Sequence, residues 1–243
     1  MSKSVLVTGA SRGIGRAIAE RFAREGYLVF INCRKSIDDL SEVSSYINNE
    51  TKGSAFMVPG NVGDPQDVKG IFEKIYSQVD VLDVLVNNAG VSIIGLMQDM
   101  TDDEWDQVVS TNLSSVFYCC RQAVPPMVTR KSGSIINISS MWGLCGASCE
   151  CGYSAAKAGV NGLTKALAKE LAPSGISVNA VAAGVVDTVM NGELCGDERR
   201  QLCEEIPAGR FAETWEVADL VWQMANSSKY MTGQVIAIDG GFL

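Results

Sequence analysis

The sequence predicts an α/β protein: a single-domain, doubly wound parallel sheet of about seven strands with helices on both faces. Short runs rich in β-branched residues alternate with longer amphipathic stretches, which implies parallel strands joined by right-handed crossovers. Most of these runs are apolar throughout, as is typical of parallel strands buried on both faces. The expected strands are Val5–Thr8, Leu28–Asn32, Ala55–Val58, Val84–Val86, Ser134–Ile138, Ser177–Val181 and Gln234–Ile238.

Helices are expected in the intervals between these strands. Apolar residues recur there at helical spacing, and the longest interval carries Val109, Leu113 and Val116 on one face. No internal repeat, low-complexity segment or linker divides the chain, so residues 1–243 should form one domain. The expected helices cover about Ile14–Glu25, a stretch after Asp67, about Asp103–Met127 and Gly152–Leu171.

The stretch 184–210 breaks this regularity. It carries glycines, charges and Pro207 between two well-patterned elements. A long irregular segment inside a compact domain is often a loop over a substrate. We therefore expect a substrate loop at 184–210, the alternative being an ordinary surface excursion.

Composition excludes several classes of function. The net charge of −8 and the pI of about 4.7 argue against nucleic acid as a partner and against docking on anionic membranes. No apolar run reaches the roughly 18 residues of a membrane span. Glycine and serine interrupt the N-terminal segment too early for a signal peptide, so a cytoplasmic location is expected. The absence of histidine removes Ser-His-Asp and Cys-His catalysis and leaves proton transfer to Tyr, Lys, Asp, Glu or Cys.

Three of the eight cysteines lie close together in the sequence. Cys145, Cys149 and Cys151 are near enough to suggest a zinc site, but no CxxC pair and no histidine completes it. Cysteines in a cytosolic chain of this size are interpreted as reduced thiols. We therefore expect no metal and interpret these three as small, buried thiols of a loop.

A glycine-rich turn follows the first expected strand and opens the first expected helix. Its spacing is GxxxGxG, not the GxGxxG of the standard dinucleotide fingerprint, but it stands at the junction that binds pyrophosphate in a Rossmann-type fold. Glycines permit a tight turn and close approach of a phosphate, and the helix N-terminus favours negative charge. The residues expected to bind a dinucleotide cofactor here are Gly9, Ser11, Arg12, Gly13, Ile14 and Gly15.

The end of the second strand indicates which dinucleotide binds. An acidic residue there would hydrogen-bond the ribose 2′-hydroxyl of NAD and repel a 2′-phosphate. The sequence instead has Arg34 and Lys35, and Arg12 could reach the same group. A guanidinium can bind a phosphate through two parallel hydrogen bonds. We therefore expect NADP(H), the alternative being that Arg34 and Lys35 form a solvated turn.

Tyr153 and Lys157 give the strongest indication of chemistry. Four residues apart on a helix, they project from the same face. A free tyrosine has a pKa of about 10 and is a poor base at neutral pH. A cation beside it favours the phenolate and lowers that pKa, which makes the pair a usable general acid or base.

Polar residues also follow the fourth and fifth strands. The segment Asn87–Gly90 follows the fourth, Ser139 and Ser140 lie just past the fifth, and Asn112 lies on the long helix between them. Because the carboxyl ends of the strands face the ligand crevice, these residues should converge with the glycine-rich turn. Each has a plain interpretation as a helix cap, a turn or a buried amide, but their joint placement favours one site.

Together these motifs resemble those of the classical short-chain dehydrogenases/reductases, and the resemblance covers essentially the full length of the chain. Within that family, the pattern is most similar to that of the bacterial 3-oxoacyl-acyl-carrier-protein reductases. The resemblance implies NADPH-dependent reduction of a ketone to a secondary alcohol and a homotetramer. The matching segments are TGASRGIG, NNAG, the Asn112 region, the serine thirteen residues before the tyrosine, YSAAK, the VNAV run and the IDGG ending.

The same resemblance implies a role for each residue of the site. Ser140 would polarise the substrate carbonyl, and Tyr153 would donate the proton. Lys157 would bind the nicotinamide ribose and lower the tyrosine pKa, and Asn112 would hold a water of a proton relay. Further cofactor contacts would come from Asn61, Val62, Asn88, Ala89, Gly90, Val186 and Thr188.

The sequence departs from the family pattern at three places. Ala183 and Gly184 replace the usual Pro-Gly, so this loop lacks the φ restriction of proline. Asn61 stands where an aspartate often contacts adenine. The residues 149–152, Cys-Glu-Cys-Gly, are unusual before the tyrosine, and they border the expected substrate pocket.

The sequence leaves more than one substrate class open. A 3-oxoacyl thioester on an acyl carrier protein requires a basic docking patch, for which Arg130 and Lys131 are candidates. Ser174, however, stands where the acyl-carrier reductases often have arginine. The alternative is a dehydrogenase of sterols, sugars or other small secondary alcohols, and a dinucleotide sensor without turnover is disfavoured by the complete catalytic set. An apolar pocket for the alternative would use Trp142, Leu144, Met190 and Leu194.

Overall fold

A computed structural model describes residues 2–189, 192 and 196–243 of the chain. Its centre is a seven-stranded parallel sheet in the order β3-β2-β1-β4-β5-β6-β7, which confirms the predicted doubly wound sheet. The strand order reverses between β1 and β4, where such folds bind ligands. The strands are β1 (Ser4–Val7), β2 (Leu28–Ile31), β3 (Ser54–Met57), β4 (Val84–Asn87), β5 (Gly133–Ser140), β6 (Ile176–Ala183) and β7 (Val235–Ile238).

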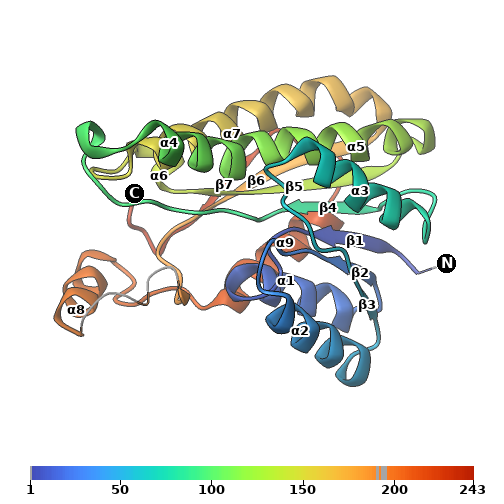
Figure 1. Cartoon of the computed structure of the whole chain (residues 1–243), viewed down its shortest axis with the longest axis horizontal. Coiled ribbons are helices and arrows are strands. Elements are labelled where there is room, and N and C mark those ends of the chain that lie inside the picture. Colours follow the sequence, from blue (N-terminus) through green and yellow to red (C-terminus); the bar gives the residue numbers. More distant parts are fainter. Residues whose placement is uncertain (1, 190–191, 193–195) are drawn as a thin grey trace.

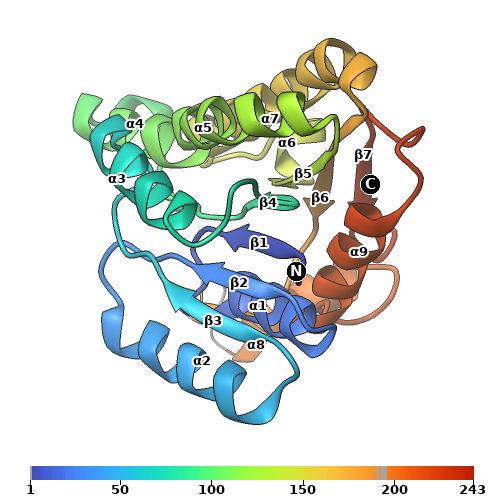
Figure 2. The same cartoon turned by 90° about the vertical axis from the view of Figure 1, so that its right-hand side faces the viewer.

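Helices cover both faces of this sheet. Figure 2 shows α3, α4, α5 and α7 on one face and α1, α2 and α9 on the other. The helices are α1 (Gly13–Arg24), α2 (Ile37–Glu50), α3 (Pro65–Tyr76), α4 (Asp102–Val109), α5 (Ser115–Arg130), α6 (Trp142–Cys145), α7 (Cys151–Leu171), α8 (Gly196–Glu205) and α9 (Thr214–Asn226), with short helical turns η1 (Met97–Asp99), η2 (Ser110–Ser114) and η3 (Ala172–Ser174).

Each face of the sheet has its own hydrophobic core. Phe22 of α1 is fully buried on one face, and Phe72 of α3 and Met127 of α5 are buried on the other. The inner strands β1, β4, β5 and β6 are buried at every residue, whereas the outer strands β3 and β7 are partly exposed. This burial explains why the strands are apolar runs rather than alternating patterns.

Two long helices, α2 and α9, were not among the predicted elements. Both carry an apolar stripe at helical spacing, with Leu40, Val43 and Ile47 buried on α2 and Val217 and Val221 buried on α9. The signal was therefore present in the sequence. Helix α2 packs against β3, and α9 packs against α1 and against β5 and β6 on the same face of the sheet.

The predicted helix over 103–127 is present, but it contains a π-helical turn. In η2 the backbone N–H of Ser115 donates to the carbonyl of Ser110, five residues back, so the chain gains one residue per turn there. Such turns inside α-helices occur frequently at functional sites. The turn carries Asn112, which was singled out from the sequence.

Strand β5 extends two residues beyond the predicted end at Ile138. Ser139 pairs with Ala182 and Ser140 with Ala183 of the parallel strand β6. Ser140 is therefore held by the sheet itself and does not belong to a loop after it.

The stretch 184–210 is more regular than its sequence predicted, because it contains α8. Figure 1 shows α8 standing apart from the layers, at the end of the molecule where α4 and α6 lie. Arg199 of α8 binds Asp187 through N–O distances of 3.1 and 2.7 Å, and its guanidinium lies 4.4 Å from the centroid of the Phe211 ring. These contacts tie α8 to the segments on either side of it.

Nothing in the described parts of the chain could act as a membrane-spanning helix: each helix there is too short or too polar.

Candidate active site

The glycine-rich turn between β1 and α1 packs directly against the end of β4. Gly9 and Gly13 have φ values of 64° and 56°, in the left-handed region that favours glycine. A side chain at Gly9 would lie 2.9 Å from the Cα of Ala89, and one at Gly15 would lie 2.1 Å from the carbonyl oxygen of Gly9. Gly9 is therefore required by both conformation and close backbone approach, Gly13 by its conformation and Gly15 by close backbone approach.

Hydrogen bonds fix the end of β4 to this turn. The side-chain amide of Asn88 donates to the carbonyls of Thr8 and Gly9 at 2.8 and 3.0 Å. The Thr8 hydroxyl in turn accepts from the backbone N–H groups of Asn88 and Ala89 at 2.9 and 3.0 Å. The predicted contact residues Asn88 and Ala89 thus lie at the glycine-rich turn, and Asn88 holds it in shape.

The N-terminus of α1 is suited to an anion. No side chain caps it, and its first turn has no acidic residue. Unpaired N–H groups and the helix dipole at such an end favour negative charge. Thr188, after β6, lies over the same turn, because a side chain at Gly13 would be 3.4 Å from its methyl carbon. Val186, also predicted to contact the cofactor, is buried and forms an isolated bridge with Ala212.

Three cationic side chains flank the turn. Arg12 precedes α1, and Arg34 and Lys35 follow β2; all three are exposed. Across residues 2–189, 192 and 196–243, no acidic group forms an ion pair with any of them. Elsewhere the arginines Arg16 and Arg21 are paired. The three unpaired cations leave positive charge where the sequence predicted a 2′-phosphate.

On the side of the site that was predicted to contact adenine, two asparagine side chains stabilise the turns after β2 and β3. Asn32 at the end of β2 donates to the carbonyls of Val58 and Gly60 at 2.9 and 3.1 Å, which joins the ends of β2 and β3. Asn61 accepts through its side-chain oxygen from the backbone N–H of Gly63 at 3.1 Å, and Val62 beside it is buried. This oxygen therefore shapes the turn, and a contact of Asn61 and Val62 with adenine stays a prediction.

Ser140 and Tyr153 meet at the end of β5. The Ser140 hydroxyl oxygen accepts from the backbone N–H of Trp142 at 3.1 Å and hydrogen-bonds the Tyr153 hydroxyl. Burial raises the pKa of Tyr153 to about 12, the bond to Ser140 lowers it, and the negative charge of Glu150 raises it. Tyr153 therefore stays protonated at neutral pH, as its predicted role of proton donor requires.

Lys157 lies one helical turn after Tyr153 and is buried. Its Nζ donates to the carbonyl of Ile138 at 2.8 Å and lies 5.5 Å from the centroid of the Tyr153 ring. Burial lowers the pKa of Lys157 to about 8. The structure thus brings the pair together, but burial of Tyr153 outweighs the expected lowering of its pKa by Lys157.

Asn112 in the π-helical turn is buried beside Lys157. Its amide donates to the carbonyls of Val108 and Val91 at 2.9 and 2.8 Å, and its oxygen accepts from the backbone N–H of Val91 at 3.1 Å. A side chain at Gly90 would lie 2.8 Å from the Asn112 oxygen and 3.6 Å from the Lys157 Nζ. Asn112 therefore fixes the segment after β4, and its part in a proton relay stays a prediction.

Two segments border the Ser140 and Tyr153 pair, and we call residues 91–99 and 144–152 together the mouth of the site. The Ser92 hydroxyl donates to the Glu150 carboxylate at 2.7 Å, and the backbone N–H of Gly95 donates to the Cys149 carbonyl at 2.8 Å. Cys149 has a φ of 61°, which is unusual outside glycine. Sequence reasoning missed Ser92, since a lone serine after a strand carries no signal.

The cysteines of the mouth differ from the prediction of buried thiols. Cys145 is exposed, and Cys149 and Cys151 are half-buried. The prediction was therefore wrong for Cys145, because the short helix α6 turns it outward. In the part of the chain that the structure describes, no three Cys, Asp or Glu residues gather in a way that could hold a metal ion.

The basic residues predicted for carrier-protein docking lie at the other edge of the sheet. Arg130 ends α5, next to the start of β5; its guanidinium pairs with Asp83 at 3.1 Å and donates to the Leu82 carbonyl at 3.0 Å. Lys131 follows with a φ of 55°. Within one chain they are therefore remote from Tyr153.

Of the predicted apolar pocket, Trp142 packs edge-on against Phe242, Leu144 is exposed, and Met190 and Leu194 lie outside the described residues.

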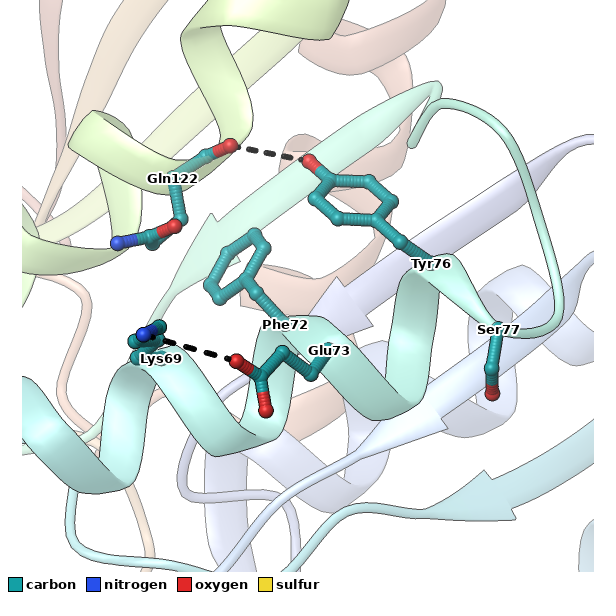
Figure 3. A pocket seen from close by; sticks show the side chains of 6 residues that line it. All are labelled: Lys69, Phe72, Glu73, Tyr76, Ser77 and Gln122. Atoms are coloured by element: carbon teal, nitrogen blue, oxygen red, sulfur yellow. Dashed lines mark hydrogen bonds and ion pairs between the residues drawn. The ribbon is translucent and has the colours of Figure 1, made fainter.

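A separate hollow of about 440 Å³ lies between α3 and α5 (Figure 3). Its polar groups are engaged: the Tyr76 hydroxyl donates to the Gln122 carbonyl at 3.1 Å, and Lys69 lies 3.9 Å from Glu73. It follows the last turns of α3, away from the carboxyl ends of the strands. The hollow is lined by Lys69, Phe72, Glu73, Tyr76, Ser77 and Gln122 and is no part of the site.

Comparison with known proteins agrees with this architecture. The short chain dehydrogenase family matches residues 3–199, and the chain belongs to this family of oxidoreductases. The chain is similar to the 3-oxoacyl-[acyl-carrier-protein] reductase FabG of Staphylococcus aureus, with 44% identity covering 99% of this chain and 98% of the relative. The corresponding protein of Escherichia coli is 40% identical over 98% of this chain and 96% of its own length.

Solved structures show the same likeness. A 3-oxoacyl-[acyl-carrier protein] reductase from Brucella melitensis superimposes with a TM-score of 0.93 at 33% identity, covering 99% of this chain and 91% of that one. A putative gluconate dehydrogenase from Agrobacterium tumefaciens superimposes with a TM-score of 0.92 at 31% identity, covering 99% and 95%. The fold and family are therefore common to proteins with different named substrates.

Proposed function

We propose that the protein reduces a ketone to a secondary alcohol with NADPH, and that the ketone is a 3-oxoacyl thioester. The observation that carries this proposal is the Tyr153 hydroxyl, which is hydrogen-bonded to Ser140, protonated at neutral pH and accompanied by the buried Lys157 Nζ 5.5 Å from its ring centroid. Bound NADPH would supply a hydride to the carbonyl carbon. The remaining chemistry, polarisation of the carbonyl and delivery of a proton, falls to side chains of this chain.

Ser140 and Tyr153 can both act on the carbonyl oxygen. The Ser140 oxygen accepts from the Trp142 N–H, so Ser140 can donate its own hydrogen, to the Tyr153 oxygen when the site is empty and to the carbonyl oxygen when a substrate is bound. Two donors aimed at an oxygen that gains negative charge stabilise that charge. Tyr153 then gives its proton to the alkoxide, and Lys157, on the same helix face, stabilises the phenolate that remains.

The residues present fit NADP(H). The uncapped N-terminus of α1 suits a pyrophosphate, and the absence of side chains at Gly9 and Gly15 lets the turn pack closely against Asn88 and Ala89. Arg34 and Arg12 would bind the 2′-phosphate, and both are exposed. The preference for NADP(H) over NAD(H) is proposed only because of the positive charge of these arginines.

The proposals of a thioester substrate and of a carrier protein as partner are based on similarity to the relatives. The FabG proteins of Staphylococcus aureus and Escherichia coli are reductases of 3-oxoacyl-[acyl-carrier-protein] by name and align with nearly the whole of this chain. We include an acyl carrier protein as partner and a homotetramer in the proposal. In a tetramer, Arg130 and Lys131 of one subunit could serve the site of another, which would reconcile their position with docking.

A dehydrogenase of sugars or other small alcohols is the second candidate. It is favoured by the likeness to the putative gluconate dehydrogenase and by the exposed, open mouth at Ile94 and Met97, which does not by itself require a long acyl chain. Both candidates use the same Ser140, Tyr153 and Lys157.

The test measures oxidation of NADPH by purified protein in the presence of an acetoacetyl thioester. The loss of NADPH absorbance reports the rate. The same assay is repeated with NADH and with simple sugar ketones. Turnover with the thioester and a clear preference for NADPH would support the proposal. Turnover with sugar ketones alone would favour the second candidate, and preference for NADH would remove the assigned role of Arg34.

A further inference from the structure

Among the residues that the structure describes, Glu150 is the acidic side chain whose charge acts on the Tyr153 hydroxyl. It lies three residues before Tyr153, at the start of α7, and its negative charge raises the pKa of Tyr153. The substrate carbonyl must reach that same hydroxyl, so the substrate's neighbouring groups will lie within range of the Glu150 charge. Coulomb interactions at a few ångströms in a partly buried site exceed thermal energy.

The carboxylate is held in place. Ser92, from the segment after β4, donates its hydroxyl to Glu150 at 2.7 Å. A second bridge joins the same two segments, from the Gly95 N–H to the Cys149 carbonyl. The Ser154 N–H donates to the Glu150 carbonyl at 2.8 Å and fixes its backbone to α7. Glu150 is thus oriented from both sides of the mouth.

The charge is not neutralised by a neighbour. No lysine or arginine in the described ranges forms an ion pair with Glu150, and its one side-chain hydrogen bond is to a neutral hydroxyl. The residue is half-buried, so water screens it incompletely. A fixed, unpaired negative charge beside the proton donor opposes any substrate that brings a second negative charge there.

We propose that Glu150 is a specificity-determining residue that excludes anionic carbonyl compounds from the mouth and so selects neutral ones. This rests on the proposed ketone reduction and deepens it. A thioester of a 3-oxo acid is neutral around its ketone, whereas the free acid carries a carboxylate two carbons away. Sugar acids would be excluded for the same reason.

The first test compares two substrates that differ by one charge, ethyl acetoacetate and acetoacetate. Wild-type protein should have a higher kcat/KM for the ester, and Glu150→Gln should shrink the ester-to-acid ratio by about tenfold, the change expected for one nearby charge. Glu150→Asp keeps the charge and should keep the discrimination. The matched control is Glu42→Gln, an exposed carboxylate on α2 across the sheet, which should leave the ratio unchanged.

A second test needs no turnover, so it separates this inference from the proposed function. Cys149 and Cys151 flank Glu150 and are half-buried. Their alkylation by neutral iodoacetamide and anionic iodoacetate, followed by mass spectrometry, reports the local charge. Glu150→Gln should raise the iodoacetate rate relative to iodoacetamide several-fold. If neither substrate is reduced but the alkylation ratio shifts, anion exclusion stands and ketone reduction fails. If Glu150→Gln moves neither ratio, the inference is wrong.

Discussion

The edge of the sheet that carries the chemistry and the mouth in front of it are built in different ways. At the edge, Ser140 lies in a strand paired on both sides, and Lys157 and Asn112 are buried with their polar groups bonded. In the mouth, Ile94 and Met97 are 75% and 77% exposed. In the proposed function, the sheet therefore fixes the catalytic groups, and substrate choice is left to segments that can vary without disturbing them.

Rigid placement of ionisable groups at this edge of the sheet opposes stability. Lys157 is a buried cation whose ionisation burial opposes, and Tyr153 is a buried phenol kept protonated. Burying such groups does not increase stability, so their placement here favours the proposed functional role. The mouth also contains a strained residue, because Cys149, directly before Glu150, has a left-handed backbone conformation.

The largest expected effect lies at the edge. Tyr153→Phe removes the proton donor and should lower kcat of ketone reduction by roughly 10²–10⁴, the usual contribution of general acid catalysis. NADPH affinity, measured by fluorescence titration, should change little, since the ring remains. Tyr76→Phe, which removes a hydroxyl bonded to the Gln122 carbonyl far from the site, is the control and should keep full activity. Equal activity in both variants would remove Tyr153 from the mechanism.

The next effect is on stability, and its sign depends on pH. In the folded chain burial lowers the pKa of Lys157 to about 8, whereas its ordinary value is 10.5. Between these values the unfolded chain binds more protons, so this residue makes the fold more stable as pH rises. Lys157→Met should therefore gain stability relative to wild type most at pH 7, and that relative gain should shrink by roughly 2–3 kcal/mol by pH 10.

Urea unfolding of both proteins across this pH range measures the difference directly, because shared titrations cancel. A gap between the two proteins that does not depend on pH would show that burial leaves the Lys157 charge undisturbed.

A smaller effect is expected at the cofactor end of the edge. Arg34→Ala removes a guanidinium assigned to the 2′-phosphate and should lower kcat/KM for NADPH by roughly 10- to 100-fold, the worth of a charged hydrogen bond. The value for NADH should stay constant or rise. Arg16→Ala, which removes an arginine paired with Glu20 on α1, serves as control and should affect both cofactors equally. Parallel losses with both cofactors in Arg34→Ala would contradict the assignment.

The smallest effect compares two strained residues in different regions. Cys149 in the mouth and Lys131 after α5 both adopt positive φ. Replacing either by glycine should relieve the strain and raise stability by about 1 kcal/mol or less, partly offset by a more flexible unfolded chain. Thermal unfolding measures this. Only Cys149→Gly should also change the kinetics with ethyl acetoacetate, a small ester that involves no docking of a carrier protein at Lys131. If Lys131→Gly changes them too, the mouth is not the part that chooses substrate.

The sequence predicted most of the edge because its physical causes are local. Buried parallel strands require apolar runs, close packing at Gly9 and Gly15 requires glycine, and one face of a helix brings Tyr153 and Lys157 together. The helices α2 and α9 also had clear patterns and could have been predicted. The site residues were found by motif and resemblance, and the structure shows that their elements converge.

What could not be predicted depends on tertiary contacts. The π-helical turn at Asn112, the extension of β5 to Ser140 and the bond between Ser92 and Glu150 each depend on partners distant in sequence. The paired state of Arg130 is of the same kind, since Asp83 lies 47 positions earlier. No local pattern reports such contacts, which is why the mouth and the docking residues were the weakest part of the prediction.

The most direct test of the account is a crystal structure of the protein with NADP⁺ and a 3-hydroxyacyl thioester. The account predicts the 2′-phosphate at Arg34 and Arg12 and the pyrophosphate at the start of α1. It also predicts the substrate hydroxyl within hydrogen-bond distance, about 2.6–3.2 Å, of the Tyr153 hydroxyl. A dinucleotide bound elsewhere, or a substrate oxygen held away from Tyr153 and Ser140, would contradict the claim that this edge carries both cofactor and proton donor.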